Sequence, residues 1–141
     1  MTENPPAAYA PQPLSPSEER TWAMLAHLSV LANLVTGFLG PLVALIIYLV
    51  NKDRSRYVAY HALQSFYFQL VFWVGTGIVA TVSWIVSGIL AAVLIGCLCM
   101  PVSLILSLLP LGALIYGIIG AVECNAGRDF KYWLVSDWVK I

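Results

Sequence analysis

Two long stretches of this sequence contain no Asp, Glu, Lys or Arg. The first runs from residue 21 to residue 51, and the second from residue 57 to residue 122. One bilayer crossing needs about 20 apolar residues, so the first stretch has room for one long crossing or two short ones, and the second for two or three. With 60% hydrophobic and only 10% charged residues, a water-soluble globule could not cover its own surface. The sequence therefore predicts an integral membrane protein.

Turn signals divide these stretches into four helical segments. Ser17 followed by two acidic residues favours a helix start, because a hydroxyl caps the first amides and carboxylates complement the helix dipole. We expect breaks at Gly37 to Pro41 and at Gly96 to Pro101, where glycine and proline remove helical restraint. The expected segments are 17–36, 42–50, 56 to between 82 and 90, and 102–125. The predicted fold class is an all-α, polytopic membrane helical bundle with a short first hairpin, of four segments, or of three if the first stretch crosses once.

The chain divides into three parts by composition. Residues 1–16 hold five prolines and no basic residue, which predicts a disordered N-terminal tail. Residues 17–127 form the predicted helical membrane domain. Residues 128–141 mix aromatic and charged side chains in the way a membrane interface favours, so we expect this C-terminal tail to lie along the headgroups. Pairing of the tail with another chain is the alternative.

The basic residues predict the orientation of the helices. They occur in only three places, and these places fall on one face of a four-segment protein: Arg20; Lys52, Arg54 and Arg56; and Arg128, Lys131 and Lys140. The two remaining turns carry no charge. Because basic flanks stay cytoplasmic, we expect a multi-pass protein of the bacterial inner (cytoplasmic) membrane with both termini inside.

One polar stripe is the most distinctive feature of the third segment. At 100° per residue, one helix face carries Tyr57, His61, Gln64, Ser65 and Phe68. Polar groups at membrane depth are costly unless they face a cavity or a partner, so this stripe is a candidate site. Interhelical packing is the interpretation we prefer to transport or catalysis, because His61 lies only about one and a half turns from the basic loop.

A second histidine, His27, lies on the first helix. Pairing it with His61 as metal ligands would require two further ligands. Near these histidines the sequence offers only Asp53 and Glu18 or Glu19, so we predict no metal site.

Other catalytic or cofactor-binding groups are scarce. Cys97 and Cys99 lack the second ligand pair of a zinc site, and we interpret them and Cys124 as small, buried hydrophobic residues. No phosphate-binding loop, nucleophile with an adjacent base, or pair of carboxylates occurs within the apolar stretches. The sequence predicts no enzyme and no cofactor, and zero net charge suggests no nucleic-acid partner.

The last segment carries small residues at a period of four. Small residues at this spacing let helix backbones approach closely in lipid. The two adjacent rows are Ala113, Gly117 and Ala121, and Gly112, Tyr116 and Gly120. We expect them to pack against other helices of the same chain, and an oligomer interface is the alternative.

Several short motifs together resemble a known family. They are residues 19–29 (ERTWAMLAHLS), 52–58 (KDRSRYV), 61–66 (HALQSF) with Gln69, and 125–127 (NAG). The pattern is similar to a family of small, uncharacterised bacterial membrane proteins grouped distantly with the membrane subunit of the chloroplast inner-envelope protein translocon. The resemblance covers residues 17 to about 135 and implies a four-helix membrane domain without known enzymatic activity. Family members often carry charged residues around the histidine that are absent here, which argues against a proton or ion relay.

Two hypotheses for function follow. The first is a non-enzymatic accessory or structural subunit that contacts the lipid bilayer and packs against other integral membrane subunits of a larger complex, or against copies of itself. The second is a pore or protein-translocation component lined by the polar stripe. A conducting path needs polar groups through the whole bilayer, and beyond Gln69 the stripe offers only Thr76, Ser83 and Ser87.

Overall fold

The computed structural model describes residues 11–141, and every regular element in that range is helical. In chain order the elements are α1 (Pro16–Leu28), the 3₁₀ turn η1 (Ser29–Leu31), α2 (Ala32–Thr36), α3 (Leu39–Asn51), α4 (Arg56–Gln69), the π-helical segment η2 (Leu70–Gly75), α5 (Thr76–Ala91), α6 (Ile95–Asn125) and the 3₁₀ turn η3 (Ser136–Trp138). The all-α prediction is confirmed for this range. The proposed N-terminal disorder falls mainly on residues 1–10, which lie outside the described residues.

Two helices are long and apolar enough to cross a membrane. One is the continuous helix Arg56–Ala91, made of α4, η2 and α5, and the other is α6. Helix α3 is apolar but shorter. Membrane-crossing capacity is thus shown for two helices, and a count of three or four crossings stays a prediction.

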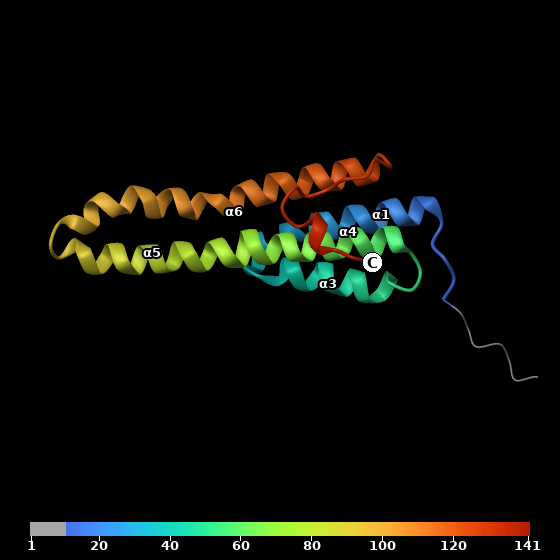
Figure 1. The fold of residues 1–141 in the computed structure, drawn as a ribbon, viewed down its shortest axis with the longest axis horizontal. Helices are drawn as coiled ribbons and strands as arrows, with labels where there is room; N and C mark the ends of the chain where they lie inside the picture. Colours follow the sequence, from blue (N-terminus) through green and yellow to red (C-terminus); the bar gives the residue numbers. More distant parts are fainter. Residues whose placement is uncertain (1–10) are drawn as a thin grey trace, which may run out of the picture.

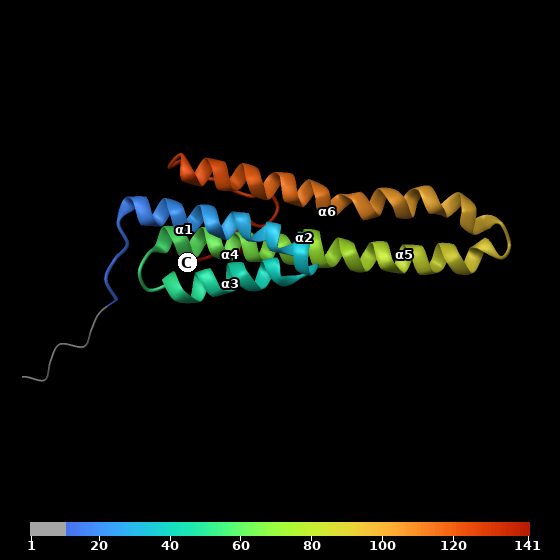
Figure 2. The ribbon, with the colours of Figure 1, turned by 180° about the vertical axis from the view of Figure 1, so that it is seen from behind.

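The molecule has two regions, which Figures 1 and 2 show from opposite sides. At one end α1, α3, α4 and the second half of α6 form a four-helix bundle, and the C-terminal segment folds back against it. At the other end α5 and the first half of α6 form a two-helix hairpin that extends well beyond α3. The 36-residue helix Arg56–Ala91 measures about 54 Å at 1.5 Å per residue, so the hairpin tip lies far from the bundle.

The start of the bundle is fixed by a capping box. Ser15 Oγ accepts a hydrogen bond from the Glu18 amide, and the Glu18 carboxylate accepts one from the Ser15 amide at 2.8 Å. Pro16 occupies the first turn, where its missing amide leaves no hydrogen bond unmade. The N-cap is therefore Ser15, two residues before the cap that we predicted at Ser17.

The first predicted break is correct at Gly37 and wrong at Gly40 to Pro41. Gly37 has φ +83° and ends α2 in the left-handed region, which glycine adopts without steric cost. Helix α3 then begins at Leu39 and includes Pro41 in its first turn. A proline is tolerated there because first-turn amides have no intrahelical acceptor.

The predicted break at Gly96 to Pro101 is wrong. The chain reverses at residues 92–94, where Leu94 takes φ +63°, and α6 then continues through both Pro101 and Pro110. Membrane helices tolerate internal proline better than soluble ones, so proline spacing is a weak stop signal here. The expected helix end at residues 125–127 is confirmed, with Gly127 at φ +73°.

The C-terminal segment is partly buried. Tyr132 and Val135 are 1% and 0% exposed and pack with Phe68 and Ala113 in one hydrophobic cluster. Trp133 on the same segment is 73% exposed. The interfacial location of this tail stays a prediction, but the structure adds that its aromatic side chains close one side of the bundle.

The basic residues gather at the bundle end of the molecule. The Arg20 guanidinium lies beside Gly127, Arg54 donates to the carbonyl of Gln12, and Arg56 donates to the carbonyl of Ile141. This grouping matches the pattern from which we predicted an inward-facing end. The side of the membrane that this end faces stays a prediction.

Candidate functional site

The polar stripe of α4 faces the interior of the bundle. His61, Gln64 and Ser65 are fully buried and Phe68 is 3% exposed, whereas Tyr57 is half-buried. These side chains meet α1 and the C-terminal segment: Ser65 donates to the Ala26 carbonyl, and Phe68 stacks on Tyr132 with ring centroids 3.9 Å apart. The stripe is therefore part of the bundle core, and its functional role stays a prediction.

Three metal-ligating side chains meet at the centre of this core. His27 Nε2 lies 3.2 Å from His61 Nδ1, and Cys124 Sγ lies 3.5 Å from the same nitrogen. All three side chains are fully buried, and they come from α1, α4 and α6 respectively. We refer to His27, His61 and Cys124 as the His/Cys cluster.

The C-terminal segment supplies both outer contacts of the cluster. The Tyr132 hydroxyl lies 2.9 Å from His27 Nδ1, and Asp129 Oδ1 lies 3.4 Å from His61 Nε2. Burial raises the pKa of Tyr132 well above its usual value of 10, so its hydroxyl stays protonated. The Asp129 side chain is 61% exposed, so this set of contacts extends from the buried core of the bundle to the molecular surface.

Hydrogen-bond donors and acceptors in the cluster can be assigned in one consistent order. If Tyr132 donates to His27 Nδ1, His27 carries its proton on Nε2 and donates to His61 Nδ1, and His61 then carries its proton on Nε2. That last nitrogen points toward Asp129 but is buried without a hydrogen bond of good geometry. The Tyr57 hydroxyl is likewise buried without a partner.

Our sequence argument against a metal site considered Asp53, Glu18 and Glu19 as further ligands. Glu18 caps α1, and Glu19 accepts a hydrogen bond from Ser55, so both are engaged elsewhere. The third side chain of a metal-binding type beside the two histidines is Cys124, which is 63 residues from His61. One signal could have found it, because Cys124 follows Gly117 by seven residues and therefore shares the small-residue face of the last helix.

The three cysteines differ in environment. Cys124 is fully buried, as predicted. Cys97 is exposed and Cys99 is partly exposed, so the prediction that all three are buried is wrong for these two. Both lie near the hairpin tip, where α5 and α6 are the only helices among residues 11–141.

A second polar layer lies one to two turns along from the His/Cys cluster. Gln69 donates to Ser29 Oγ at 2.8 Å and to Ser65 Oγ at 3.0 Å, and it accepts from Asn33 at 3.1 Å. Asn33 in turn accepts from the Gly40 amide at 2.7 Å. Four segments are thus joined by side chains that would otherwise be unsatisfied inside an apolar bundle.

The small-residue face of α6 packs within the molecule. One predicted row is buried along its length: Ala113, Gly117 and Ala121. A Cβ at Gly117 would lie 2.8 Å from Val30 Cγ1 in η1 and 3.3 Å from the His27 carbonyl oxygen in α1, which shows how closely α6 approaches both elements. In the second row Gly120 is buried and Tyr116 is half-buried, whereas Gly112 is exposed.

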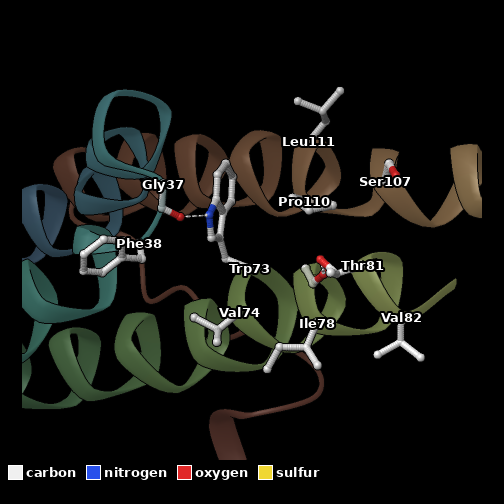
Figure 3. A pocket seen from close by; sticks show the side chains of 11 residues that line it. Gly37, Phe38, Trp73, Val74, Ile78, Thr81, Val82, Ser107, Pro110 and Leu111 are labelled. Atoms are coloured by element: carbon white, nitrogen blue, oxygen red, sulfur yellow. Dashed lines mark hydrogen bonds between the residues drawn. The ribbon is translucent and has the colours of Figure 1, made fainter. Parts of the chain in front are cut away.

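A surface groove lies where the hairpin leaves the bundle, and Figure 3 shows it closely. Its volume is about 660 Å³, and Trp73 on one wall donates to the Gly37 carbonyl at 2.6 Å. None of its eleven lining residues is ionisable: Gly37, Phe38, Trp73, Val74, Gly77, Ile78, Thr81, Val82, Ser107, Pro110 and Leu111. The groove suits an apolar occupant, and its lining offers no ionisable acid or base.

Comparison with known proteins gives one match. The sequence pattern of the magnetosome magnetite crystal formation protein family matches residues 18–139, so the chain belongs to that family. No curated protein and no solved structure matches the chain. The membrane character of the predicted family is thus supported, whereas nothing found links the chain to the chloroplast translocon subunit.

Proposed function

We propose that this member of the magnetosome magnetite crystal formation family is a non-enzymatic accessory protein of a bacterial magnetosome membrane. The family match over residues 18–139 is the observation that carries the proposal. Two helices of membrane-spanning length and composition support it, since a protein built in this way needs a bilayer or a partner around its apolar surface.

The hairpin is the surface that we propose for contact with lipid and with other membrane subunits. Its outer side chains are large and apolar, as in Ile78 at 60% exposed, Ile89 at 70% and Leu98 at 81%. Its two helices contact each other through hydroxyl groups, because the Ser103 hydroxyl is hydrogen-bonded to those of both Ser83 and Ser87. Because these polar groups satisfy one another, the exposed faces are free to meet lipid tails or apolar helices.

An accessory function fits the chemistry of the interior better than a pore does. The polar stripe is occupied by contacts within the bundle, and Ser65 and Gln69 use their hydrogen-bonding groups on α1 and its neighbours. No observation in the described residues favours a polar path along the hairpin. We therefore retain the accessory interpretation and do not develop the translocation alternative.

The proposal is tested in a bacterium that forms magnetite. Deletion of the gene is expected to change the size or shape of the crystals in electron micrographs, and the intact chain supplied in trans should restore them. A tagged chain should fractionate with magnetosome membranes and, after extraction in mild detergent, retain a stoichiometric membrane partner. Unchanged crystals in the deletion strain would refute a role in crystal formation, and a solely monomeric tagged protein would refute the accessory-subunit part.

A further inference from the structure

The ligand atoms of the His/Cys cluster are close enough to bind one ion. His27 Nε2, His61 Nδ1 and Cys124 Sγ all lie within 4.8 Å of one another. They come from three helices that are distant in sequence, so the fold itself assembles the group. Their full burial removes competing water, which strengthens any charge interaction inside the cluster.

Two of the three distances between the ligand atoms agree with tetrahedral coordination. Two nitrogens bound at about 2.05 Å to one tetrahedral ion lie about 3.4 Å apart, and a bound nitrogen and thiolate sulfur lie about 3.6 Å apart. The structure has 3.2 Å between His27 Nε2 and His61 Nδ1, and 3.5 Å between His61 Nδ1 and Cys124 Sγ. The third pair, His27 and Cys124, lies within 4.8 Å, so these side chains must approach by up to about 1.2 Å for one ion to bind all three.

The outer contacts are those of a metal-binding histidine pair. A ligating histidine nearly always donates its second ring N–H to a carboxylate or another acceptor, which fixes the ring and raises its basicity. His61 Nε2 faces the Asp129 carboxylate at 3.4 Å, and His27 Nδ1 faces the Tyr132 hydroxyl at 2.9 Å. Both nitrogens that remain after metal binding thus have an acceptor in place.

We propose that His27, His61 and Cys124 form a buried site for one divalent transition-metal ion such as Zn²⁺, with Asp129 and Tyr132 orienting the two imidazoles. The inference rests on this geometry and does not depend on the proposed function. Imidazole and thiolate ligands favour borderline and soft ions over Mg²⁺ or Ca²⁺, which prefer oxygen.

Charge and protons balance in this site. The Cys124 thiol loses one proton on binding, and the proton of His27 moves from Nε2 to Nδ1, so one proton is released for each ion bound. The doubly charged ion, the thiolate and the Asp129 carboxylate then sum to zero, which limits the cost of burying the ion. The unpartnered Tyr57 hydroxyl lies beside Cys124 and supplies a hydrogen-bond donor for the thiolate.

Titration of the full chain with Co²⁺ under reducing conditions in detergent tests the proposal, because Co²⁺ bound to thiolate has a characteristic near-ultraviolet charge-transfer band. We expect one Co²⁺ per chain, displaced by Zn²⁺. Cys124→Ser should abolish the band, and Cys97→Ser should leave it unchanged as the matched control. Asp129→Asn should keep the stoichiometry but weaken affinity about 10- to 100-fold.

Protection of thiols in the wild-type chain gives a second readout that needs no variant. Zn²⁺ is expected to slow alkylation of Cys124 while Cys97 stays reactive. The proposal is overturned if the helical chain binds no Co²⁺ at one equivalent. It is equally overturned if the thiolate band survives Cys124→Ser, or if the metal-free chain is alkylated at Cys124 at a measurable rate and Zn²⁺ leaves that rate unchanged.

Discussion

The bundle and the hairpin differ in how they satisfy the polar groups between their helices. The bundle encloses side chains that can form many hydrogen bonds, among them His27, His61 and Gln69, and joins them across four segments. The hairpin has only two helices, which approach closely at Gly96 and share the hydroxyl of Ser103. A polar interior thus requires several surrounding elements, whereas a two-helix unit needs only small residues and hydroxyls. We therefore expect ion binding in the bundle, and contact with lipid or other membrane subunits along the hairpin.

The depth of the two regions in the membrane is the sharpest test of this comparison. The charge pattern predicts that both uncharged turns lie on the outer side of the membrane. The structure places the Gly37 turn beside Trp73, and roughly 18 helical residues, or about 27 Å, separate Trp73 from the tip at Ala91. If this helix crosses the bilayer, the two turns differ in depth by most of this distance, so we predict that they do not both lie at the outer surface.

Labelling of single cysteines tests the orientation of the helices, because each position either reacts with the reagent or is protected from it. On a background lacking the three native cysteines, a cysteine at position 93 should react with an impermeant reagent applied from outside, and cysteines at 10, 55 and 135 should be protected. The reason is that translocating Lys52, Arg54 and Arg56 opposes the positive-inside bias. A cysteine at position 38 should be protected if the bundle lies in the cytoplasmic half of the bilayer. Labelling at position 55 together with protection at position 93 would show that the orientation is the opposite of the predicted one.

Gly96→Ala should be the most destabilising single change in the hairpin. An added Cβ would lie 2.0 Å from the Ser87 carbonyl oxygen and 2.2 Å from the Ala91 amide nitrogen, and backbone atoms cannot move aside cheaply. We expect a loss of about 3 kcal/mol in the free energy of unfolding, at the upper end for overpacking. Denaturation in mixed detergent, followed by circular dichroism, measures it.

Gly88→Ala is the matched control on the facing helix, since nothing lies within 4 Å of its Cβ position. It should be neutral or slightly stabilising, because alanine favours a helix by up to about 1 kcal/mol over glycine. Equal effects of the two changes would show that close backbone approach does not hold the hairpin together.

Gln69→Leu should destabilise the bundle, because it leaves the side-chain amide of Asn33 without its acceptor and removes the donor to Ser29 Oγ. A lost interhelical hydrogen bond in a membrane protein costs about 0.6 kcal/mol on average, so these two bonds imply about 1 kcal/mol, and the buried amide left unpaired adds about 1 kcal/mol more. Ser103→Ala in the hairpin removes two hydroxyl contacts and should cost about 1 kcal/mol by the same measure. Unfolding of each variant in detergent compares them, and a larger effect for Ser103→Ala would contradict the proposed division between the regions.

Sequence periodicity predicts the stripe on α4 and the small-residue row on α6 because each depends on a single helix. His61, Ser65 and Gly117 all face inward as the helical period requires. The His/Cys cluster depends on how three helices are placed in space, and no local pattern relates Cys124 to His27. The predicted position of the hairpin tip is wrong for another reason. Proline usually ends helices in soluble proteins, whereas α6 continues through Pro101.

Tyr132→Phe should have a small effect on stability, similar to that of Ser103→Ala, and the most specific dependence on pH. Phenylalanine keeps the stack on Phe68 but removes the hydroxyl that contacts His27, a loss of about 1 kcal/mol for one hydrogen bond. Burial raises the pKa of Tyr132 well above 10 in the folded chain, so above pH 10 the unfolded chain loses a proton that the folded chain retains. The stability that this tyrosine supplies is therefore complete below pH 10 and decreases above it, by about 1.4 kcal/mol per pH unit. Unfolding measured from pH 9 to pH 11 should show a steeper decline for the wild type than for Tyr132→Phe. Trp133→Phe, at an exposed neighbouring position, should keep the wild-type slope, and identical slopes for the wild type and Tyr132→Phe would mean that Tyr132 is not held protonated in the bundle.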